Sequence, residues 1–226
     1  MITWLQDLRY ALRQLRKSPS FTVAAVLTLA LAIGANVVVF SVLNGVILRP
    51  LNVPQAESLY LLESASDKNT AQSYPDYLDF RDRNHSFDGL AAFGMAQVAI
   101  NAGDGPSVER NVEASCNYFD ALRFEPYLGR LFHDSDDHGP NSAPYMVLSY
   151  DYWHSHFQDD RGVGRVVQLN EHPFTIIGVA PPEFRGTIVF FSPNFWVPIE
   201  NHEQIDAGID MNDRGSRWLF MSIGHL

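Results

Sequence analysis

The chain has 226 residues, of which 46% are hydrophobic, and a formal net charge of −10 at pH 7. The acidic balance argues against nucleic-acid binding, because Lys and Arg form no cluster beyond residue 20. The single cysteine, Cys116, excludes an internal disulfide and is expected to be a small buried hydrophobe.

The first residues have an amphipathic pattern. Apolar residues recur at helical spacing from Trp4 to Leu15, whereas Arg9, Arg13 and Arg16 fall largely elsewhere. This pattern predicts a helix lying in the membrane interface within residues 1–19, ended by Ser18-Pro19. The alternative is a basic, partly ordered tail.

A long apolar segment follows. No charged side chain occurs from Phe21 to Leu48, and about 20 apolar residues suffice for a helix to cross a bilayer. We therefore predict a transmembrane helix within residues 20–49, with surplus length that tilts it or extends it into water as a stalk. A signal peptide, whose apolar region spans about 7 to 15 residues, fits this length poorly, as does a soluble core helix.

Small and weakly polar residues cluster in the middle of this segment. Ala30, Gly34, Ala35 and Asn36 suit close packing against other transmembrane helices. We predict that these four residues form its packing face.

The charge of the flanks predicts the orientation. Arg9, Arg13, Arg16 and Lys17 against Asp7 give residues 1–20 a charge of +3, and the remainder has −13. Because cytoplasmic flanks collect Lys and Arg, the N-terminus should lie in the cytoplasm and the remainder outside. In a bacterium this is a single-pass topology in the inner membrane with a periplasmic domain.

Residues 50–226 predict an α+β fold in one domain or two small subdomains. We expect a helix capped by Ser73 that runs to about Asn84 and buries Tyr77, Leu78 and Phe80. A short helix at 117–122 should turn Tyr118, Phe119 and Leu122 inward, and Ser149 should cap another whose Trp153 and Phe157 lie four apart on one face. Strands are expected at 60–62, 145–148, 163–169 and 174–179, with a hairpin turn at 103–106.

The sequence lacks the common catalytic and metal-binding motifs. There is no phosphate-binding loop, no Gly-x-Ser-x-Gly elbow and no His-Glu-x-x-His. The segment His133–Gly139 resembles the start of a calcium loop, but Tyr145 stands where the bidentate Glu is required, so a solvated acidic loop is expected. His154 and His156 are two apart and do not share a helix face. We therefore expect no catalytic, cofactor-binding or metal-binding residue.

Several motifs, in order along nearly the whole chain, resemble one family. They are LRKSPSFT at 15–22, LTLALAIGAN at 27–36, FSV at 40–42, LRPL at 48–51, SYPDY at 73–77, NYF at 117–119, LGR at 128–130, VLSY at 147–150 and NEHPFTIIGVAPP at 170–182. In this order and spacing they resemble the MacB-like and FtsX-like permeases of type VII ABC transporters, especially the duplicated orphan permeases.

The resemblance implies a first transmembrane helix followed by a periplasmic core domain. It also implies a cytoplasmic ABC ATPase as a separate chain, a homo- or heterodimer of permeases, contact with membrane lipid and no catalysis in the permease itself. The expected function is an exporter or mechanotransmission subunit. Family members continue to three further transmembrane helices, whereas this chain stops within residues 218–226, so we expect a partial core domain and a fragment of such a permease. The alternatives are a stand-alone membrane-anchored periplasmic binding or interaction module and, third, a periplasmic enzyme.

Overall fold

The computed structural model describes residues 10, 13, 15–46, 52–63, 71–102, 105–157, 162–188, 191–219 and 221–226. The chain divides into two compact units, Met1–Pro50 and Leu51–Leu226, and each is described by itself.

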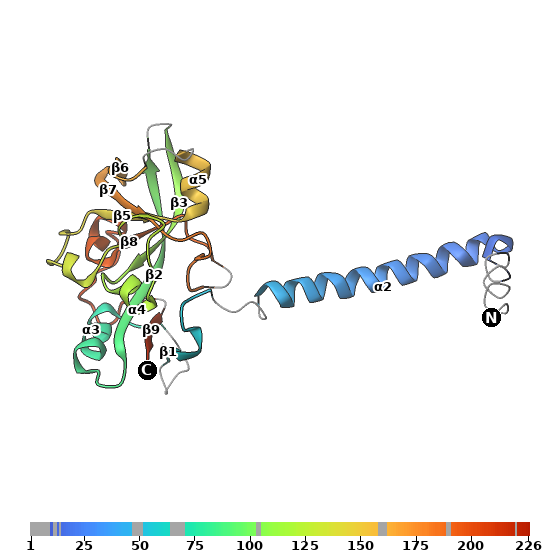
Figure 1. The fold of residues 1–226 in the computed structure, drawn as a ribbon, viewed down its shortest axis with the longest axis horizontal. Coiled ribbons are helices and arrows are strands. Elements are labelled where there is room, and N and C mark those ends of the chain that lie inside the picture. Colours follow the sequence, from blue (N-terminus) through green and yellow to red (C-terminus); the bar gives the residue numbers. More distant parts are fainter. Residues whose placement is uncertain are drawn as a thin grey trace. The chain divides into compact units, whose positions relative to one another are not determined.

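The first unit is dominated by one helix, α2 (Pro19–Val46) (Figure 1). It starts where Pro19 fits the first helical turn, which lacks a hydrogen-bond acceptor for its N–H groups. Its polar side chains bond to the helix itself, since Asn36 Nδ2 donates to the carbonyl of Ala32 at 2.9 Å. Residues 19–41 form a helix long and apolar enough to cross a membrane by length and composition. The predicted long apolar helix is confirmed, although its predicted end lies outside the described residues.

The interfacial helix predicted between Trp4 and Leu15 lies mostly outside the described residues. Tyr10, Arg13 and residues 15–17 are helical and exposed. The length of the interfacial helix therefore remains a prediction.

The second unit is a mixed α+β domain, as predicted. Its helices are α3 (Tyr74–Arg83), α4 (Tyr118–Leu122), α5 (Tyr150–Phe157), α6 (His202–Ile205) and the short 3₁₀ turns η1 (Ala56–Ser58), η2 (Asp134–Asp136) and η3 (Ile199–Asn201). Its strands are β1 (Leu59–Leu62), β2 (Asp88–Asn101), β3 (Pro106–Ala114), β4 (Leu128–Gly129), β5 (Tyr145–Leu148), β6 (Val166–Leu169), β7 (His172–Val179), β8 (Phe195–Pro198) and β9 (Met221–His225).

Six of these strands close into a barrel. The pairings run β2–β3–β8–β5–β7–β6 and return to β2, because Ile100 and Asn101 of β2 pair with Leu169 and Gln168 of β6. The β3–β8 and β5–β7 pairs are parallel and the others are antiparallel. Closure leaves no free edge around this part of the sheet.

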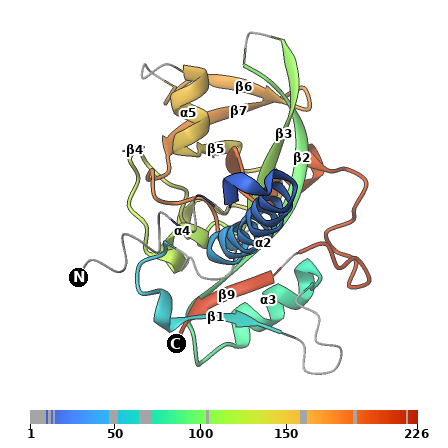
Figure 2. The same ribbon diagram turned by 90° about the vertical axis from the view of Figure 1, so that its right-hand side faces the viewer.

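The other half of β2 extends the sheet beyond the barrel. Its residues from Asp88 to Phe93 pair with β9, and β9 pairs with β1. Helix α3 lies beside this three-stranded extension (Figure 2). The chain segments before and after the barrel therefore meet at one end of the domain.

Two large apolar clusters hold the domain together. One lies on the barrel-interior face of β2, β5, β6, β7 and β8 and includes α5 side chains. The other surrounds Phe119 of α4, whose ring packs at 4.8 Å from Phe132 and 5.7 Å from Trp196. Edge-to-face packing of this kind adds to the free energy gained from burying the rings.

Most local predictions are confirmed. Ser73 caps α3 by accepting a hydrogen bond from the backbone N–H of Asp76 at 3.2 Å, and Ser149 accepts one from that of Tyr152 at 3.3 Å. Tyr118, Phe119, Leu122 and Cys116 are buried as predicted, and Trp153 and Phe157, predicted to share one face of α5, are both buried.

The prediction for Phe80 is wrong. Tyr77 is buried, but the Phe80 side chain is 51% exposed. The two residues are three apart and share one side of α3, yet Phe80 lines the open groove beside the helix while Tyr77 packs into the domain. Strands β8 and β9 and helix α6 were not predicted either.

Candidate functional site

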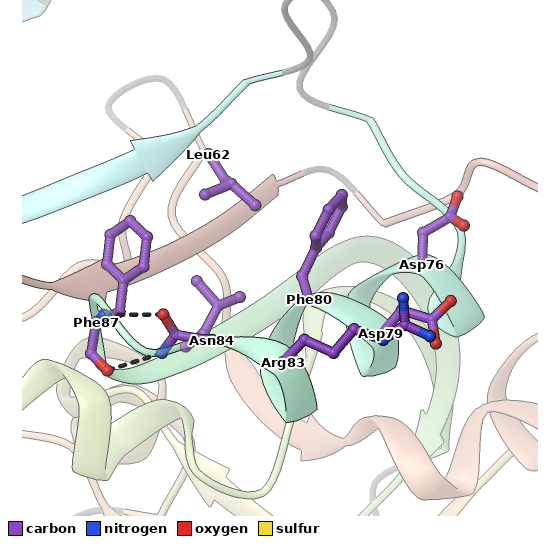
Figure 3. Close-up of a pocket in the computed structure, with 8 residues that line it drawn as sticks. Leu62, Asp76, Asp79, Phe80, Arg83, Asn84 and Phe87 are labelled. Carbon is purple, nitrogen blue, oxygen red and sulfur yellow. Dashed lines mark hydrogen bonds between the residues drawn. The ribbon is translucent and has the colours of Figure 1, made fainter.

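Helix α3 forms one wall of a surface groove of about 390 Å³ (Figure 3). Residues from three elements line the groove: Leu62 of β1; Asp76, Asp79, Phe80 and Arg83 of α3; Asn84 and Phe87 of the following turn; and Leu90 of β2. Its apolar side chains are Leu62, Phe80, Phe87 and Leu90, and its charged residues, Asp76, Asp79 and Arg83, lie along α3. The groove therefore presents an aromatic and aliphatic surface beside a charged rim.

The turn after α3 is fixed by one side chain. Asn84 Nδ2 donates to the carbonyl of Phe87 at 2.7 Å, and Asn84 Oδ1 accepts hydrogen bonds from the N–H groups of Ser86 and Phe87, each at 2.9 Å (Figure 3). Asn is suited to this task because its amide both donates and accepts. The backbone of Phe87 is thereby fixed beside the groove that its ring lines.

The charged rim is organised by Arg214, which precedes β9 in the chain. Its guanidinium donates to Asp76 at 2.7 Å and to Asp79 at 2.6 Å. The hydrogen bond from Arg214 lowers the pKa of Asp79. These exposed pairs join the 206–218 segment to α3.

A second hollow of about 600 Å³ adjoins the groove and shares Asn84 and Leu90 with it. It is lined by Arg81, Asp82, Asn84, Gly89, Leu90, Asn117, Asp120, Asp134 and Asp137. Asp82 pairs with Arg81 at 2.9 Å and Asp120 with His133 at 2.6 Å. No cation within the described residues pairs with Asp134 or Asp137, so this acidic hollow retains negative charge.

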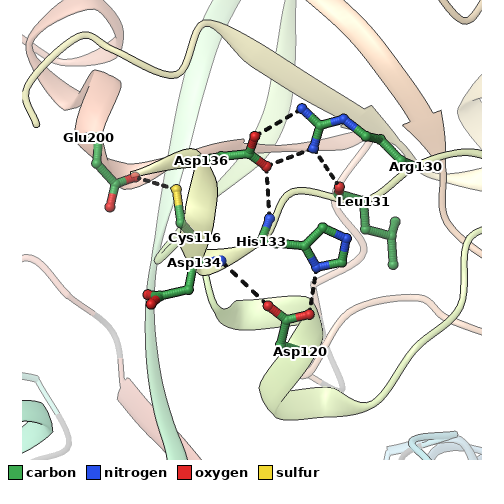
Figure 4. A network of polar contacts seen from close by, with 8 residues as sticks. All are labelled: Cys116, Asp120, Arg130, Leu131, His133, Asp134, Asp136 and Glu200. Atoms are coloured by element: carbon green, nitrogen blue, oxygen red, sulfur yellow. Dashed lines mark hydrogen bonds and ion pairs between the residues drawn. The ribbon is translucent and has the colours of Figure 1, made fainter. Parts of the chain in front are cut away.

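The acidic wall of this hollow is held by a polar network (Figure 4). Arg130 forms a two-pronged pair with Asp136 at 2.7 and 2.9 Å, and Asp136 also accepts from the N–H of His133 at 2.9 Å. Burial would raise the pKa of Asp136, but these hydrogen bonds prevail and lower it. Asp120 accepts from the N–H of Asp134 at 3.4 Å. The segment His133–Gly139, predicted to be a solvated acidic loop, is thus a turn fixed by hydrogen bonds, and its Asp134 side chain is exposed to solvent.

Behind this network lies a buried carboxyl group. Glu200 is only 5% exposed, and the Cys116 thiol donates to its Oε2 at 3.1 Å (Figure 4). Burial raises the pKa of Glu200 to about 7. Burial, followed by the nearby Glu200 charge, raises the pKa of the Cys116 thiol, which makes it a poor nucleophile.

The candidate site is a surface of apolar and acidic side chains. Within the described part of the chain, no group of three or more His, Cys, Asp or Glu side chains is placed to hold a metal ion. Most carboxylates of the site bond to Arg, His or backbone N–H groups. What the site does present to solvent is an apolar groove joined to an acidic hollow.

The residues chosen from the sequence lie elsewhere. Ala30, Gly34, Ala35 and Asn36 are exposed on α2, and a Cβ built on Gly34 meets no atom within 4 Å. Their role in helix packing remains a prediction. Arg13, Arg16 and Lys17 are exposed, and Arg9 lies outside the described residues.

Sequence reasoning missed the groove. Leu62, Phe80 and Phe87 come from a strand, a helix and a turn, and no periodicity relates them. The one available signal was Asn84, which stands at the end of the predicted helix and three residues before Phe87, as turn-forming Asn residues do.

Comparisons with known proteins agree on the fold. The family model described as MacB-like periplasmic core domain matches residues 22–221. The crystal structure of the periplasmic region of MacB from Actinobacillus actinomycetemcomitans superposes with a TM-score of 0.52 at 16% identity, covering 73% of this chain and 71% of that one. A domain assigned to a permease of Porphyromonas gingivalis superposes with a TM-score of 0.54 at 12% identity, covering 77% of each chain.

A search of curated protein sequences gave no match. The structural likenesses are too distant in sequence to show more than the fold, but the family model extends over most of the chain. The chain belongs to the family of MacB-like periplasmic core domains of ABC transporter permeases.

Proposed function

We propose that this chain is a membrane-anchored permease subunit of an ABC-type exporter or mechanotransmission system. In this role it couples ATP hydrolysis by a partner to motion of its extracytoplasmic domain. The proposal rests on one observation: in a chain that matches the MacB-like periplasmic core domain, a long, uncharged and mostly apolar helix directly precedes the compact Leu51–Leu226 unit. An anchor in this position suits the transfer of movement across a membrane.

The surface of α2 supports a membrane location. Its apolar side chains, including Leu27, Leu31 and Phe40, are exposed. An exposed apolar surface of this length is favourable only in lipid or against other helices. Arg13, Arg16 and Lys17 precede the helix and favour a cytoplasmic N-terminus, with the domain in the periplasm or its equivalent.

The partner in this proposal is a separate ABC ATPase chain, and the permease acts as a homo- or heterodimer in the inner membrane. The chain itself performs no catalysis, which is consistent with its lack of a phosphate-binding loop. The packing face proposed for the dimer or for further helices contains Ala30, Gly34, Ala35 and Asn36.

One observation favours a second function, that of a stand-alone membrane-anchored binding or interaction module. The barrel closes within Leu51–Leu226, which forms one compact unit. A closed core of this kind is able to present a binding surface without further domains.

Purification in mild detergent separates the two functions. A coupling subunit should be recovered from its native membranes together with an ABC ATPase, whereas a stand-alone module should be recovered without one. Residues 50–226, expressed alone, provide the complementary test: cooperative unfolding together with a specific bound ligand favours the module. Aggregation without a melting transition favours a domain that needs the rest of a permease.

A further inference from the structure

We infer that the α3 groove and the adjoining acidic hollow together form a docking site for a segment of a partner protein. This segment has an aromatic or aliphatic anchor followed, within one or two helical turns, by Lys or Arg. The inference goes beyond the proposed coupling and does not depend on it, because it concerns only the surface of the Leu51–Leu226 unit.

The apolar half of the site is an exposed aromatic surface. Phe80 is 51% exposed, although it stands in the middle of a helix whose neighbouring Tyr77 is fully packed. With Leu62 and Phe87 it lines a hollow of about 390 Å³. Concave apolar surfaces of this kind, with a few polar groups at the rim, are typical of sites that take an anchor side chain.

The acidic half is adjacent to the apolar half. Asn84 and Leu90 line both hollows, so the two hollows meet at the C-terminal end of α3. Four carboxylates line the second hollow, and among its described lining residues Arg81 is the single Lys or Arg. Because Asp134 and Asp137 have no cation partner within the described residues, a Lys or Arg placed there gains a partner without breaking an existing pair.

Charge complementarity selects the occupant. Residues 51–226 contain 11 Lys or Arg and 25 Asp or Glu, so a second copy of this domain would bring further negative charge to an acidic site. An anionic lipid surface would be repelled for the same reason. A basic, apolar-anchored segment of another protein satisfies both halves.

The site is formed before any partner arrives. The Asn84 hydrogen bonds fix Phe87, the Arg130–Asp136 pair fixes the acidic turn, and Arg214 ties the rim to α3. A preformed site loses little conformational entropy on binding.

The test is a titration of the full chain in nanodiscs of zwitterionic lipid with a fluorescent peptide of about 12 residues, or three helical turns. The peptide has Leu and Phe anchors followed by Lys, and its binding is read from fluorescence anisotropy after subtraction of empty nanodiscs. We expect saturable binding that weakens at higher salt. Phe80→Ala should weaken it by about tenfold. Asp134→Asn with Asp137→Asn should weaken it comparably and reduce the salt dependence.

Matched controls use β6 and the β6–β7 turn, which lie at the opposite end of the domain from α3 (Figure 1). Val166→Ala removes an apolar side chain that is 58% exposed, and Glu171→Gln removes an exposed charge. Both variants should bind like wild type. Circular dichroism of every variant confirms that the fold is intact.

Four outcomes would overturn the inference. They are equal binding to the Phe80→Ala variant, equal binding of a peptide with Glu in place of Lys, no binding of either peptide, and self-association of the chain that Phe80→Ala abolishes. The last outcome would assign the groove to a second copy. None of the four affects whether an ATPase co-purifies with the chain, so this inference and the proposed coupling fail separately.

Discussion

Glu113 Oε2 lies 2.6 Å from His202 Nδ1, and both side chains are 1% exposed. The pair joins β3 to α6, and the His202 ring stacks on Trp218 with ring centroids 4.0 Å apart. Burial raises the pKa of Glu113 against the opposing effect of the hydrogen bond from His202. A buried acid–base pair therefore attaches the 202–218 segment, which includes the Arg214 rim of the groove, to the barrel.

Removing one member of this pair should cost far more than an exposed substitution. His202→Ala leaves the Glu113 carboxyl buried without its partner, and we expect a loss of about 3–5 kcal/mol in the free energy of unfolding. Denaturant titration of the full chain in detergent measures it, with Trp218 fluorescence reporting the local change. In a double-mutant cycle with Glu113→Gln the losses should be non-additive by about 1–3 kcal/mol. Additive losses would show that the two side chains are independent.

Glu200 should make stability depend on pH. Its pKa is raised to about 7 in the folded domain, so the native state holds this proton more tightly than the unfolded chain does. The contribution is fully present below about pH 4.5, the ordinary value, and is lost as pH rises through about 7; it amounts to about 3 kcal/mol.

We expect Glu200→Gln to flatten the fall in stability between pH 5 and pH 8, measured by thermal unfolding across that range. Glu203→Gln, three residues later, changes an exposed carboxylate that accepts a hydrogen bond from Asn141 Nδ2 at 3.1 Å; it is the matched control and should keep the wild-type pH profile. A profile of Glu200→Gln that parallels wild type would contradict this role for Glu200.

Two phenylalanines should differ sharply in their structural importance. Phe119 is fully buried among Phe132, Phe184 and Trp196, so Phe119→Ala should destabilise the domain by about 3–5 kcal/mol. Phe80→Ala should cost less than about 1 kcal/mol, because half of that side chain already contacts water. The midpoints of denaturant unfolding decide it, and a large loss for Phe80→Ala would mean that Phe80 serves the fold instead of a ligand.

The backbone contact between β4 and β7 should tolerate no side chain. A Cβ on Gly178 would lie 2.0 Å from the carbonyl oxygen of Arg130, which belongs to the backbone and cannot rotate away. We expect Gly178→Ala to lower the free energy of unfolding by about 2 kcal/mol or more and to expose the Arg130–Asp136 turn to proteolysis. A wild-type melting temperature would show that the strands separate at little cost.

Cysteine labelling can test the proposed topology. Cys116 is 2% exposed and should not react with a maleimide. Ser107→Cys, at an exposed position of β3, therefore reports the side of the membrane on which the domain lies, and Ser18→Cys reports the side of the N-terminus. In intact cells a membrane-impermeant maleimide should label the residue at 107 but not the one at 18. The reverse pattern would place the domain in the cytoplasm.

The local structure of this protein can be predicted from its sequence, but the closure of the six-stranded barrel cannot. Caps such as Ser73 and Ser149 and the Asn170–Glu171 turn are short-range signals, and the helices and strands they bound are where the sequence predicts them. Strand β8 was missed because all four of its residues are buried, which removes the alternation that marks a half-exposed strand.

The candidate site was less predictable than the fold. Helical spacing indicates that Tyr77 and Phe80 share a side of α3, but only the tertiary packing of α3 decides which of them is covered. Arg214 pairs with Asp76 and Asp79, which lie more than 130 residues earlier in the sequence. No local sequence pattern predicts a pairing over that separation. The packing face of α2 and the domain boundaries remain predictions.

The central claim is that ATP hydrolysis by a partner moves this domain. The most direct measurement labels Ser107→Cys with an environment-sensitive fluorophore in the complex purified from native membranes in mild detergent. On addition of Mg·ATP, we expect hydrolysis by a co-purified ABC ATPase together with a fluorescence change that repeats with each cycle of hydrolysis. A non-hydrolysable analogue should not sustain these repeated changes. A complex without an ATPase, or hydrolysis that leaves the fluorescence unchanged, would contradict it.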